Sequence, residues 1–203
     1  MFADENIQKS NTSDQNNSPQ MTFLLYLHDL VYMLATIMLV FLLLFRMVIV
    51  SGSSMYETLH DGDWLVLISN VFYQEPEYGD IIVASKDSFN NGEAIIKRVI
   101  ATEGQQVDID FEAGAVYVDG VQLQEDYINN LTHNGRGVEF PLIVEEGCIF
   151  VLGDNRAVSL DSRYAEIGQI DKREVLGKAL FLMLPGTSHG EQPQDFGRIG
   201  AIQ

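Results

Sequence analysis

The sequence has 203 residues, of which 46% are hydrophobic, and 29 acidic residues against 12 basic ones give a formal net charge of -17 at pH 7. This size and composition allow one folded domain plus one membrane segment. The negative charge repels nucleic-acid phosphates, which argues against nucleic acid as a partner. Cys148 is the only cysteine and the four histidines lie far apart, so we expect no intrachain disulfide, no metal site and no cofactor.

The chain begins with a segment rich in Asn, Gln, Ser and Asp, which cannot bury enough apolar surface to fold. It then becomes apolar on every side, interrupted only by Arg46, for long enough to cross a hydrocarbon layer of about 30 Å. We predict a disordered tail over 1–29, a transmembrane helix over 30–50 with Arg46 marking one end, and an exported β domain over 51–203. The flanking charges, Lys9 and Arg46, balance and leave the orientation open.

Beyond the predicted span, the pattern changes to short runs rich in Val and Ile that are separated by turn residues, which is typical of strands. Asp119-Gly120 predicts a hairpin turn, and Pro185-Gly186 ends the last run. No long amphipathic helix is indicated, so the fold class is mainly β. The predicted strands cover 64–68, 80–84, 94–100, 107–111, 116–118, 148–152 and 178–184.

Two segments hold residues suited to nucleophilic chemistry. The Ser-Gly-Ser-Ser-Met segment at 51–55 follows the predicted span, and its small residues would let the backbone approach a ligand and present a hydroxyl. Lys97 lies in an apolar strand and shares a face with Ile95 and Val99 by strict alternation. Burial there would lower the lysine pKa, so that a neutral amine could accept a proton from a serine. Taken singly, the first segment also fits a linker and the second a solvated strand.

A third segment, read together with the first two, favours the catalytic interpretation of both. Read with the Gly-Asp-Asn-Arg…Ser-x-Asp-Ser-Arg run at 153–163, Ser54 before methionine and Lys97 before arginine resemble the signature boxes of type I signal peptidases, in the same order. The segments at 78–83 and 175–179 resemble two further boxes of that family. The resemblance implies a signal-peptidase-like β-sheet or barrel domain preceded by one transmembrane helix, and a serine endopeptidase.

The resemblance also implies a role for each matching residue at the reacting centre. Ser54 would be the nucleophile, with its backbone N–H in the oxyanion hole, and Lys97 would be the general base. The Ser159 hydroxyl would orient the Lys97 amine. The second oxyanion-hole donor stays open. Residues expected to contact the substrate are Gly52, Ser53, Met55 and Tyr56.

Two ion pairs are implied as supports of the site. They would join Asp161 to Arg163 and Asp154 to Arg98. As surface pairs they would contribute about 0–1 kcal/mol each, so we expect their role to be positional.

The sequence departs from the family pattern at two turns. Glu57 and Glu103 stand where the family has prolines, which removes two fixed φ angles. Gly52 stands where some members have a serine hydroxyl, and Ser53 is adjacent to that position without being equivalent. The predicted catalytic residues are unchanged, so we expect effects on substrate fit and rate.

The predicted function is the removal of signal peptides from exported preproteins by a single-pass protein of the plasma membrane, with its catalytic domain outside the cytoplasm. The partners would be preproteins with an A-x-A cleavage site and the lipid bilayer. Three alternatives stay open. They are a membrane-anchored Cys transpeptidase that uses Cys148, His133 and an arginine, a self-cleaving Ser/Lys regulator that binds DNA, and an inactive tethered binding homologue.

Overall fold

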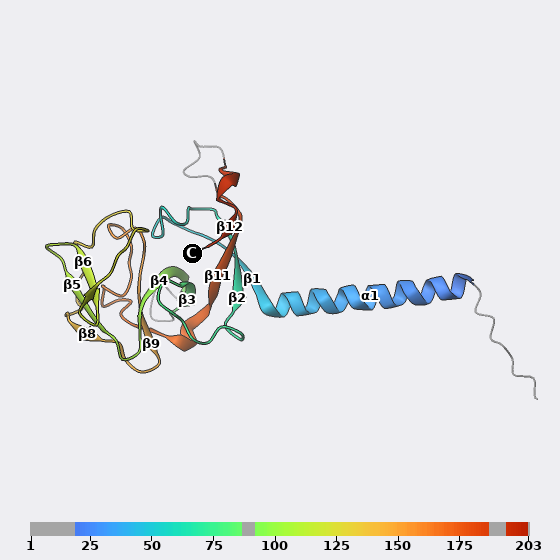
Figure 1. The fold of residues 1–203 in the computed structure, drawn as a ribbon, viewed down its shortest axis with the longest axis horizontal. Coiled ribbons are helices and arrows are strands. Elements are labelled where there is room, and N and C mark those ends of the chain that lie inside the picture. Colours follow the sequence, from blue (N-terminus) through green and yellow to red (C-terminus); the bar gives the residue numbers. More distant parts are fainter. Residues whose placement is uncertain (1–18, 87–91, 187–193, 203) are drawn as a thin grey trace, which may run out of the picture. The chain divides into compact units, whose positions relative to one another are not determined.

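A computed structural model describes residues 19–86, 92–186 and 194–202 of the chain. The chain divides into two units, residues 1–41 and residues 42–203, each of which is described here by itself (Figure 1). Within the described residues the structure holds one long helix and a set of short strands. The predicted mainly β fold class is confirmed.

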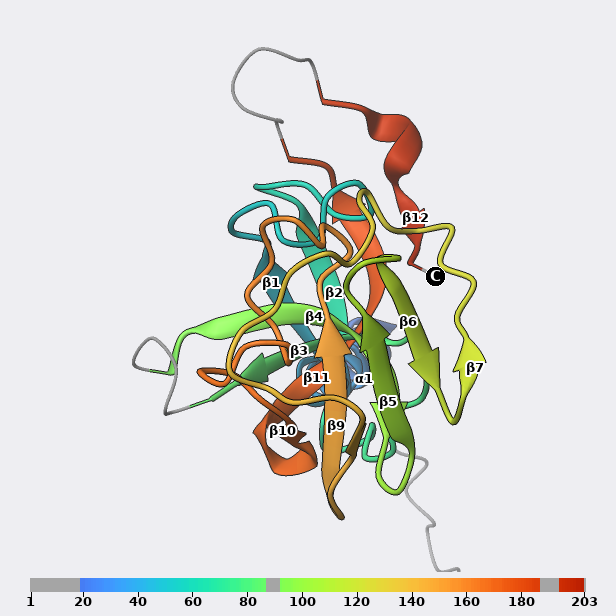
Figure 2. The same ribbon diagram turned by 90° about the vertical axis from the view of Figure 1, so that its left-hand side faces the viewer.

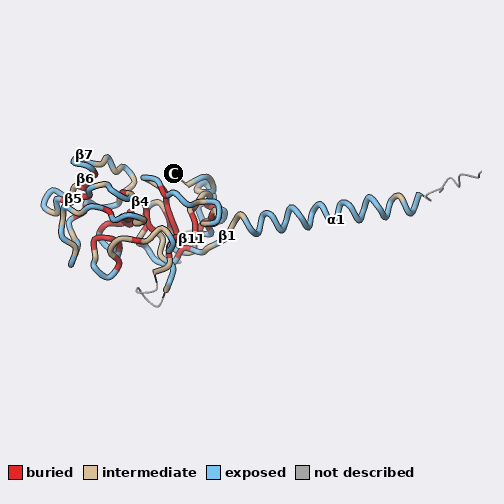
Figure 3. Tube along the Cα trace, turned by 90° about the horizontal axis from the view of Figure 1, so that it is seen from below, coloured by how far each residue is buried: buried red, intermediate tan, exposed pale blue. Residues whose placement is uncertain are grey.

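Helix α1, Pro19–Leu44, is 26 residues long, has no buried residue (Figure 3) and lies in the first unit up to residue 41. It is long and apolar enough to cross a membrane, with a mean hydropathy of 2.2 over its most apolar window. The helix begins at a proline, which the first helical turn tolerates because its N–H needs no partner there. The predicted tail over 1–29 is therefore wrong from residue 19 onward. Its first 18 residues lie outside the described part of the chain.

The C-terminal bound of the predicted helix, residue 50, is also wrong. Residues Phe45–Ile49 form strand β1, which pairs antiparallel with strand β2, Trp64–Ser69. Arg46 lies opposite Leu67 in this pairing, two positions after Leu44, where the helix ends. Apolarity alone does not separate a helix from a strand, and here the cross-strand pairing decides in favour of the strand.

The larger sheet contains the strands that carry the candidate site. Its order is β1-β2-β11-β3-β4-β9-β10, and β12 pairs with β11 outside that path. All of its neighbouring strands are antiparallel (Figure 2). The remaining strands of this sheet are β3 (Ile81–Ser85), β4 (Ala94–Thr102), β9 (Cys148–Leu152), β10 (Ile170–Asp171), β11 (Val175–Leu184) and β12 (Gly200–Ala201).

A smaller sheet has the order β7-β6-β5-β8. The predicted Asp119-Gly120 turn joins β6 to β7, and Asp119 has a φ of 52° there. The strands are β5 (Gln106–Asp110), β6 (Ala115–Val118), β7 (Val121–Gln122) and β8 (Leu142–Ile143). Two 3-10 turns complete the described elements, η2 (Lys172–Glu174) and η4 (Phe196–Arg198).

Three clusters of buried apolar side chains form the core. The first contains Met55 and Leu59 together with side chains of β2, β3 and β11, so the loop after β1 is anchored in the core. The second joins the smaller sheet to β4 and β9 through residues such as Val107 and Phe150. The third contains residues of β3, β4, β9 and β11, among them Val99.

Candidate active site

Ser54 lies on a loop that is closed at its base and anchored in the core. We call residues 50–63 the serine loop. Val50 N–H donates to Asp63 O at 2.8 Å, and the Val50 carbonyl accepts from Gly62 N–H at 2.9 Å, so the two ends are bonded together. Met55 and Leu59 are each 1% exposed in the first core cluster. The loop therefore holds its serine in a defined place, although it contains no strand.

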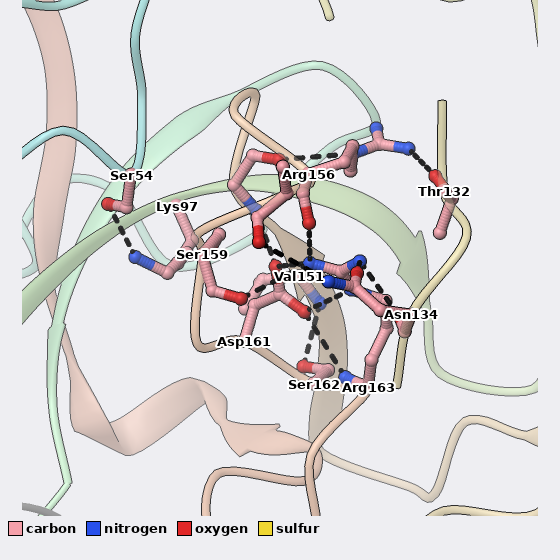
Figure 4. A network of polar contacts seen from close by, with 12 residues as sticks. Ser54, Lys97, Thr132, Asn134, Val151, Arg156, Ser159, Asp161, Ser162 and Arg163 are labelled. Carbon is pink, nitrogen blue, oxygen red and sulfur yellow. Dashed lines mark hydrogen bonds and ion pairs between the residues drawn. The ribbon is translucent and has the colours of Figure 1, made fainter. Parts of the chain in front are cut away.

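Lys97 lies on β4 and reaches the serine. Its Nζ lies 2.9 Å from Ser54 Oγ and also donates to the Ile96 carbonyl at 2.9 Å (Figure 4). The residue is 4% exposed, in agreement with the alternation that places it on the face of Ile95 and Val99, both of which contact the third core cluster. A primary amine and a hydroxyl at this distance are placed for direct proton transfer.

Burial lowers the pKa of Lys97 to about 8 from its ordinary value of 10.5. The cause is desolvation of the ammonium group, which the nearby Arg163 charge reinforces. The carboxylates of Asp161 and Asp154 act in the opposite direction. At pH 7 roughly one amine in ten is then neutral, compared with fewer than roughly one in a thousand at the ordinary lysine pKa.

The Ser54 backbone is placed for a further function. Its carbonyl accepts from Asn155 N–H at 3.0 Å, whereas its own N–H has no hydrogen-bond partner within the part of the chain that the structure describes. A free N–H beside the hydroxyl can donate to an oxyanion. The Gly52 N–H is already bonded to Asp61 Oδ1 at 2.7 Å, so it is not free in the same way.

Ser159 does not make the hydrogen bond expected of it. Its hydroxyl is buried, and within the described residues it has no hydrogen-bond partner. The Lys97 amine is instead oriented by Ser54 Oγ and the Ile96 carbonyl. Between Ser159 and the Ser54 carbonyl lies Gly153, where an added Cβ would come within 2.2 Å of Ser159 Oγ and 2.5 Å of Ser54 O.

Both predicted ion pairs are formed, and neither lies at the surface. Asp161 and Arg163 are fully buried and contact each other through Nε and Oδ1 at 2.8 Å (Figure 4). Arg98 donates to both carboxylate oxygens of Asp154 at 2.9 and 2.8 Å, with the two side chains 3% and 0% exposed. The expected contribution of about 0–1 kcal/mol each, which holds for surface pairs, is therefore wrong for these two ion pairs. Loss of one partner would leave a buried charge.

Several residues of the site escaped the sequence analysis. Asn155 donates its side-chain amide to Ser53 O at 3.1 Å in addition to its backbone bond with Ser54. Thr58 donates its hydroxyl to Asp154 Oδ2 at 2.5 Å and so ties the serine loop to the third motif segment. Asn155 lies in the motif segment at 153–163 and Thr58 lies four residues after Ser54, but the sequence does not show which residues they contact.

A buried arginine of the same segment also has partners that its sequence does not reveal. Arg156 forms a double contact with Glu125 at 3.1 and 2.6 Å and donates to Thr132 Oγ1 at 2.7 Å. Its Nε donates to the Gly153 carbonyl at 3.0 Å. It therefore holds the backbone at Gly153, which lies next to Ser159 and the Ser54 carbonyl.

A cavity of about 270 Å³ opens beside Ser54 and Lys97. Of the four residues expected to contact the substrate, only Met55 lines it. Tyr56 stacks on His60 at 4.9 Å between ring centroids instead. The side chains that line the cavity are mainly apolar and include Val48, Ile49, Val50, Val83, Ile95, Ile96, Val158 and Leu160.

The residues of the alternative cysteine enzyme do not form a comparable site. Cys148 begins β9, and burial raises the pKa of its thiol, which disfavours the thiolate. His133 Nδ1 contacts the Phe111 carbonyl at 3.0 Å. In the described ranges, no group of three or more His, Cys, Asp or Glu side chains is placed to hold a metal ion.

Glu103, one of the two residues that replace a family proline, has a structural role of its own. Its carboxylate accepts from Gly147 N–H at 2.8 Å and lies 3.3 Å from Lys172 Nζ. These contacts, the Gly147 bond first, lower the pKa of Glu103. A side-chain tie therefore replaces the fixed φ of a proline at this turn. Glu57 is exposed on the serine loop.

Comparison with known proteins agrees with this geometry. The sequence profile of the family described as "Signal peptidase, peptidase S26" matches residues 24–184. The "Probable signal peptidase I-1" of Synechocystis sp. is 37% identical over 150 residues, which cover 70% of this chain and 72% of that protein. "Signal peptidase I" of Bacillus amyloliquefaciens is 35% identical over 150 residues, which cover 70% and 75% of the two chains.

Among solved structures, a signal peptidase I from Enterococcus faecalis V583 is 32% identical and aligns with a TM-score of 0.42, over 51% of this chain and 96% of that chain. The assignment rests on the family match to residues 24–184 and on the two relatives, each of which covers 70% of the chain. The chain therefore belongs to the signal peptidase, peptidase S26 family and is a serine endopeptidase.

Proposed function

We propose that this chain removes N-terminal signal peptides from exported preproteins, with Ser54 as the nucleophile and Lys97 as the general base. The observation that carries the proposal is the 2.9 Å contact between Ser54 Oγ and a Lys97 amine that is 4% exposed. A serine needs an adjacent base to become a nucleophile at neutral pH, and a desolvated lysine can supply one.

The first step is attack of Ser54 Oγ on the scissile carbonyl carbon while Lys97 Nζ takes the hydroxyl proton. The oxyanion accepts from the free Ser54 N–H. As the peptide C–N bond breaks, Lys97 returns the proton to the leaving amine. In the second step neutral Lys97 takes a proton from water, which attacks the acyl ester carbonyl. As the ester C–O bond breaks, Lys97 returns this proton to Ser54 Oγ, which restores the free serine and the neutral amine.

The apolar cavity supports preproteins as substrates. It contains both Ser54 and Lys97, and its other lining side chains are mainly apolar, so it fits short uncharged side chains next to the scissile bond. Small residues of an A-x-A sequence match this requirement.

Helix α1 supports membrane anchoring. It has 26 residues, enough at about 1.5 Å each to cross a hydrocarbon layer of about 30 Å, and none of them is buried in the protein. We propose a single-pass plasma-membrane protein with its catalytic domain outside the cytoplasm. Protease added to intact cells should degrade residues 60–200. Protection of that region with digestion of the N-terminus would contradict this orientation.

The proposed function is tested by incubating the detergent-solubilised protein with a purified preprotein that has an A-x-A site. We expect cleavage directly after that site, mapped by N-terminal sequencing of the product. The Cys148→Ala variant should cut at the same rate, since Cys148 has no part in the reaction. Cleavage that depends on Cys148 would favour the cysteine enzyme instead.

The rate should depend on the protonation of Lys97. A general base works only when it is deprotonated, so kcat/KM should rise about tenfold per pH unit on the acid side and level off above an apparent pKa of about 8. Initial rates at low substrate concentration between pH 5.5 and 10 measure this profile. If kcat/KM levels off only near the ordinary lysine pKa of 10.5, burial does not lower the pKa of Lys97.

Gly153→Ala should lower kcat by about 100-fold, because the added methyl group displaces the Ser54 backbone by a fraction of an ångström or more. The double variant Gly153→Ala/Ser159→Gly separates the two clashes, since it leaves only the one with the Ser54 carbonyl. We expect it to stay slow. Full activity in the double variant would mean that the Ser54 backbone tolerates the methyl group.

A further inference from the structure

The segment at the C-terminal end of the described chain packs onto the catalytic domain beyond the family match. The match ends at residue 184, and the C-terminal arm, residues 194–202, follows later in the chain. In this arm β12 pairs antiparallel with β11, and Ile202 N–H donates to the Leu180 carbonyl at 3.0 Å. Ile202 also packs against the first core cluster, which contains the anchors of the serine loop.

The arm reaches the serine loop through one guanidinium group. Arg198 donates to Asp63 Oδ1 at 3.1 Å and to Asp63 Oδ2 at 2.7 Å, a paired contact that fixes both position and orientation. It also donates to the Thr58 carbonyl at 3.3 Å. Thr58 and Asp63 lie four and nine positions after Ser54 in the sequence.

Asp63 is the residue that closes the loop. Its carbonyl accepts from Val50 N–H at 2.8 Å, and its carboxylate accepts from His60 N–H and Gly186 N–H at 2.7 Å each. The carboxylate is fully buried, whereas the Arg198 side chain is 19% exposed. Without the guanidinium, a buried negative charge would be left with backbone donors alone, which favours rearrangement of the loop base.

Thr58, the second loop residue that Arg198 contacts, also connects the serine loop to the ion pair beside Lys97. Its carbonyl is held by Arg198, while its hydroxyl donates to Asp154, the partner of Arg98 beside Lys97. The arm therefore contacts the serine loop at Thr58. The Thr58 hydroxyl connects this loop, through Asp154 and Arg98, to β4, the strand that contains Lys97.

We propose that Arg198 is a positioning residue that holds Ser54 within reach of Lys97 through Asp63 and Thr58. This inference rests on the proposed function. Arg198 lies outside the residues that line the cavity, so it acts on the geometry of the reaction and not on substrate binding. A displacement of about 1 Å between reacting groups is enough to slow a reaction by roughly 100-fold.

The test compares cleavage kinetics of the full-length wild type, Arg198→Gln, Arg198→Lys and the control Arg173→Gln. Arg173 pairs with Asp171 on the surface with its side chain 89% exposed, so the control removes the same charge from another ion pair. We expect kcat of Arg198→Gln to fall at least about tenfold at unchanged KM. The lysine should restore part of the loss, because it keeps the charge without the paired contact.

His60 gives a second readout that needs no substrate. It lies on the serine loop, where burial and then the Arg198 charge lower its pKa, against Asp63 and Glu57, which raise it. In Arg198→Gln the His60 pKa, followed by NMR of the imidazole group, should therefore rise, and in Arg173→Gln it should not change.

The outcomes separate the two proposals. If the wild type does not cleave preprotein, the proposed function fails, and the His60 titration still shows whether the arm contacts the loop. If the wild type cleaves while Arg198→Gln matches it in kcat, or loses activity only through KM, the positioning role is overturned. An unchanged His60 pKa in Arg198→Gln would overturn the contact itself.

Discussion

Ser54→Ala should lower kcat/KM for preprotein cleavage by roughly 10⁴-fold or more, because Ser54 supplies the only hydroxyl bonded to Lys97 Nζ within the described residues. Lys97→Met should cause a loss of the same order, since methionine fills a similar volume but accepts no proton. The double variant should be no slower than either single variant, because nucleophile and base act as one unit. Single-turnover cleavage with excess enzyme gives these rates.

The controls for this prediction lie on the same elements. Ser53→Ala changes a neighbouring exposed serine whose backbone carbonyl, and not its side chain, bonds to Asn155, so it should retain most activity. All variants should keep the wild-type unfolding midpoint within a few degrees. Losses of Ser54→Ala and Lys97→Met that multiply in the double variant would show that the two residues act independently.

Arg163→Met should lower the free energy of unfolding by about 3–5 kcal/mol, because it leaves the Asp161 carboxylate buried without its partner. Arg163 also donates to Asn134 at 2.9 and 2.7 Å and to the carbonyls of Arg156 and Ser159, so the segment around Asn134 and the segment at 153–163 lose a common support. Denaturant unfolding of the solubilised protein measures the change.

The matched control for that variant is Arg136→Met. Arg136 pairs with Glu166 at 3.3 Å, with the side chains 81% and 58% exposed, so its loss should change stability by less than about 1 kcal/mol. Equal losses in the free energy of unfolding of Arg163→Met and Arg136→Met would mean that burial does not increase the contribution of the Arg163 pair to stability.

Arg163→Met has a second readout in the pH profile. The Arg163 charge lowers the pKa of Lys97 and the Asp161 charge raises it. Removing Arg163 takes away one of the charges that lower the Lys97 pKa. The Lys97 pKa should therefore rise, and the pH range over which kcat/KM increases should move to higher pH. A limb that moved to lower pH would contradict the assigned causes of the shift.

The sequence predicted the β class and most long strands because short runs rich in Val and Ile, such as 94–100, are separated by turn residues. It misplaced the helix because the apolar run continues without a break from α1 into β1, and only pairing with β2 separates them. The short strands β7, β8, β10 and β12 have two residues each, too few for any periodicity.

At the site, the contact between Ser54 and Lys97 and the two ion pairs were predictable, whereas the missing Ser159 hydrogen bond and the burial of the pairs were not. Alternation on β4 indicated that Lys97 would be buried, and the structure places it there. The ion pairs followed from the motif, but whether they lie at the surface depends on packing that one segment does not reveal. Arg198 was beyond prediction, because its partner Asp63 lies 135 positions earlier in the chain.

The most direct test of the Ser54/Lys97 mechanism is to find the covalent intermediate. Wild-type protein turning over a preprotein at pH 8 is quenched in acid, which protonates Lys97 and preserves an ester, and is then digested and analysed by mass spectrometry. We predict that the peptide containing Ser54 gains the mass of the signal peptide less water. An adduct on another residue, such as Cys148, or product formation with no adduct at any quench time, would contradict it.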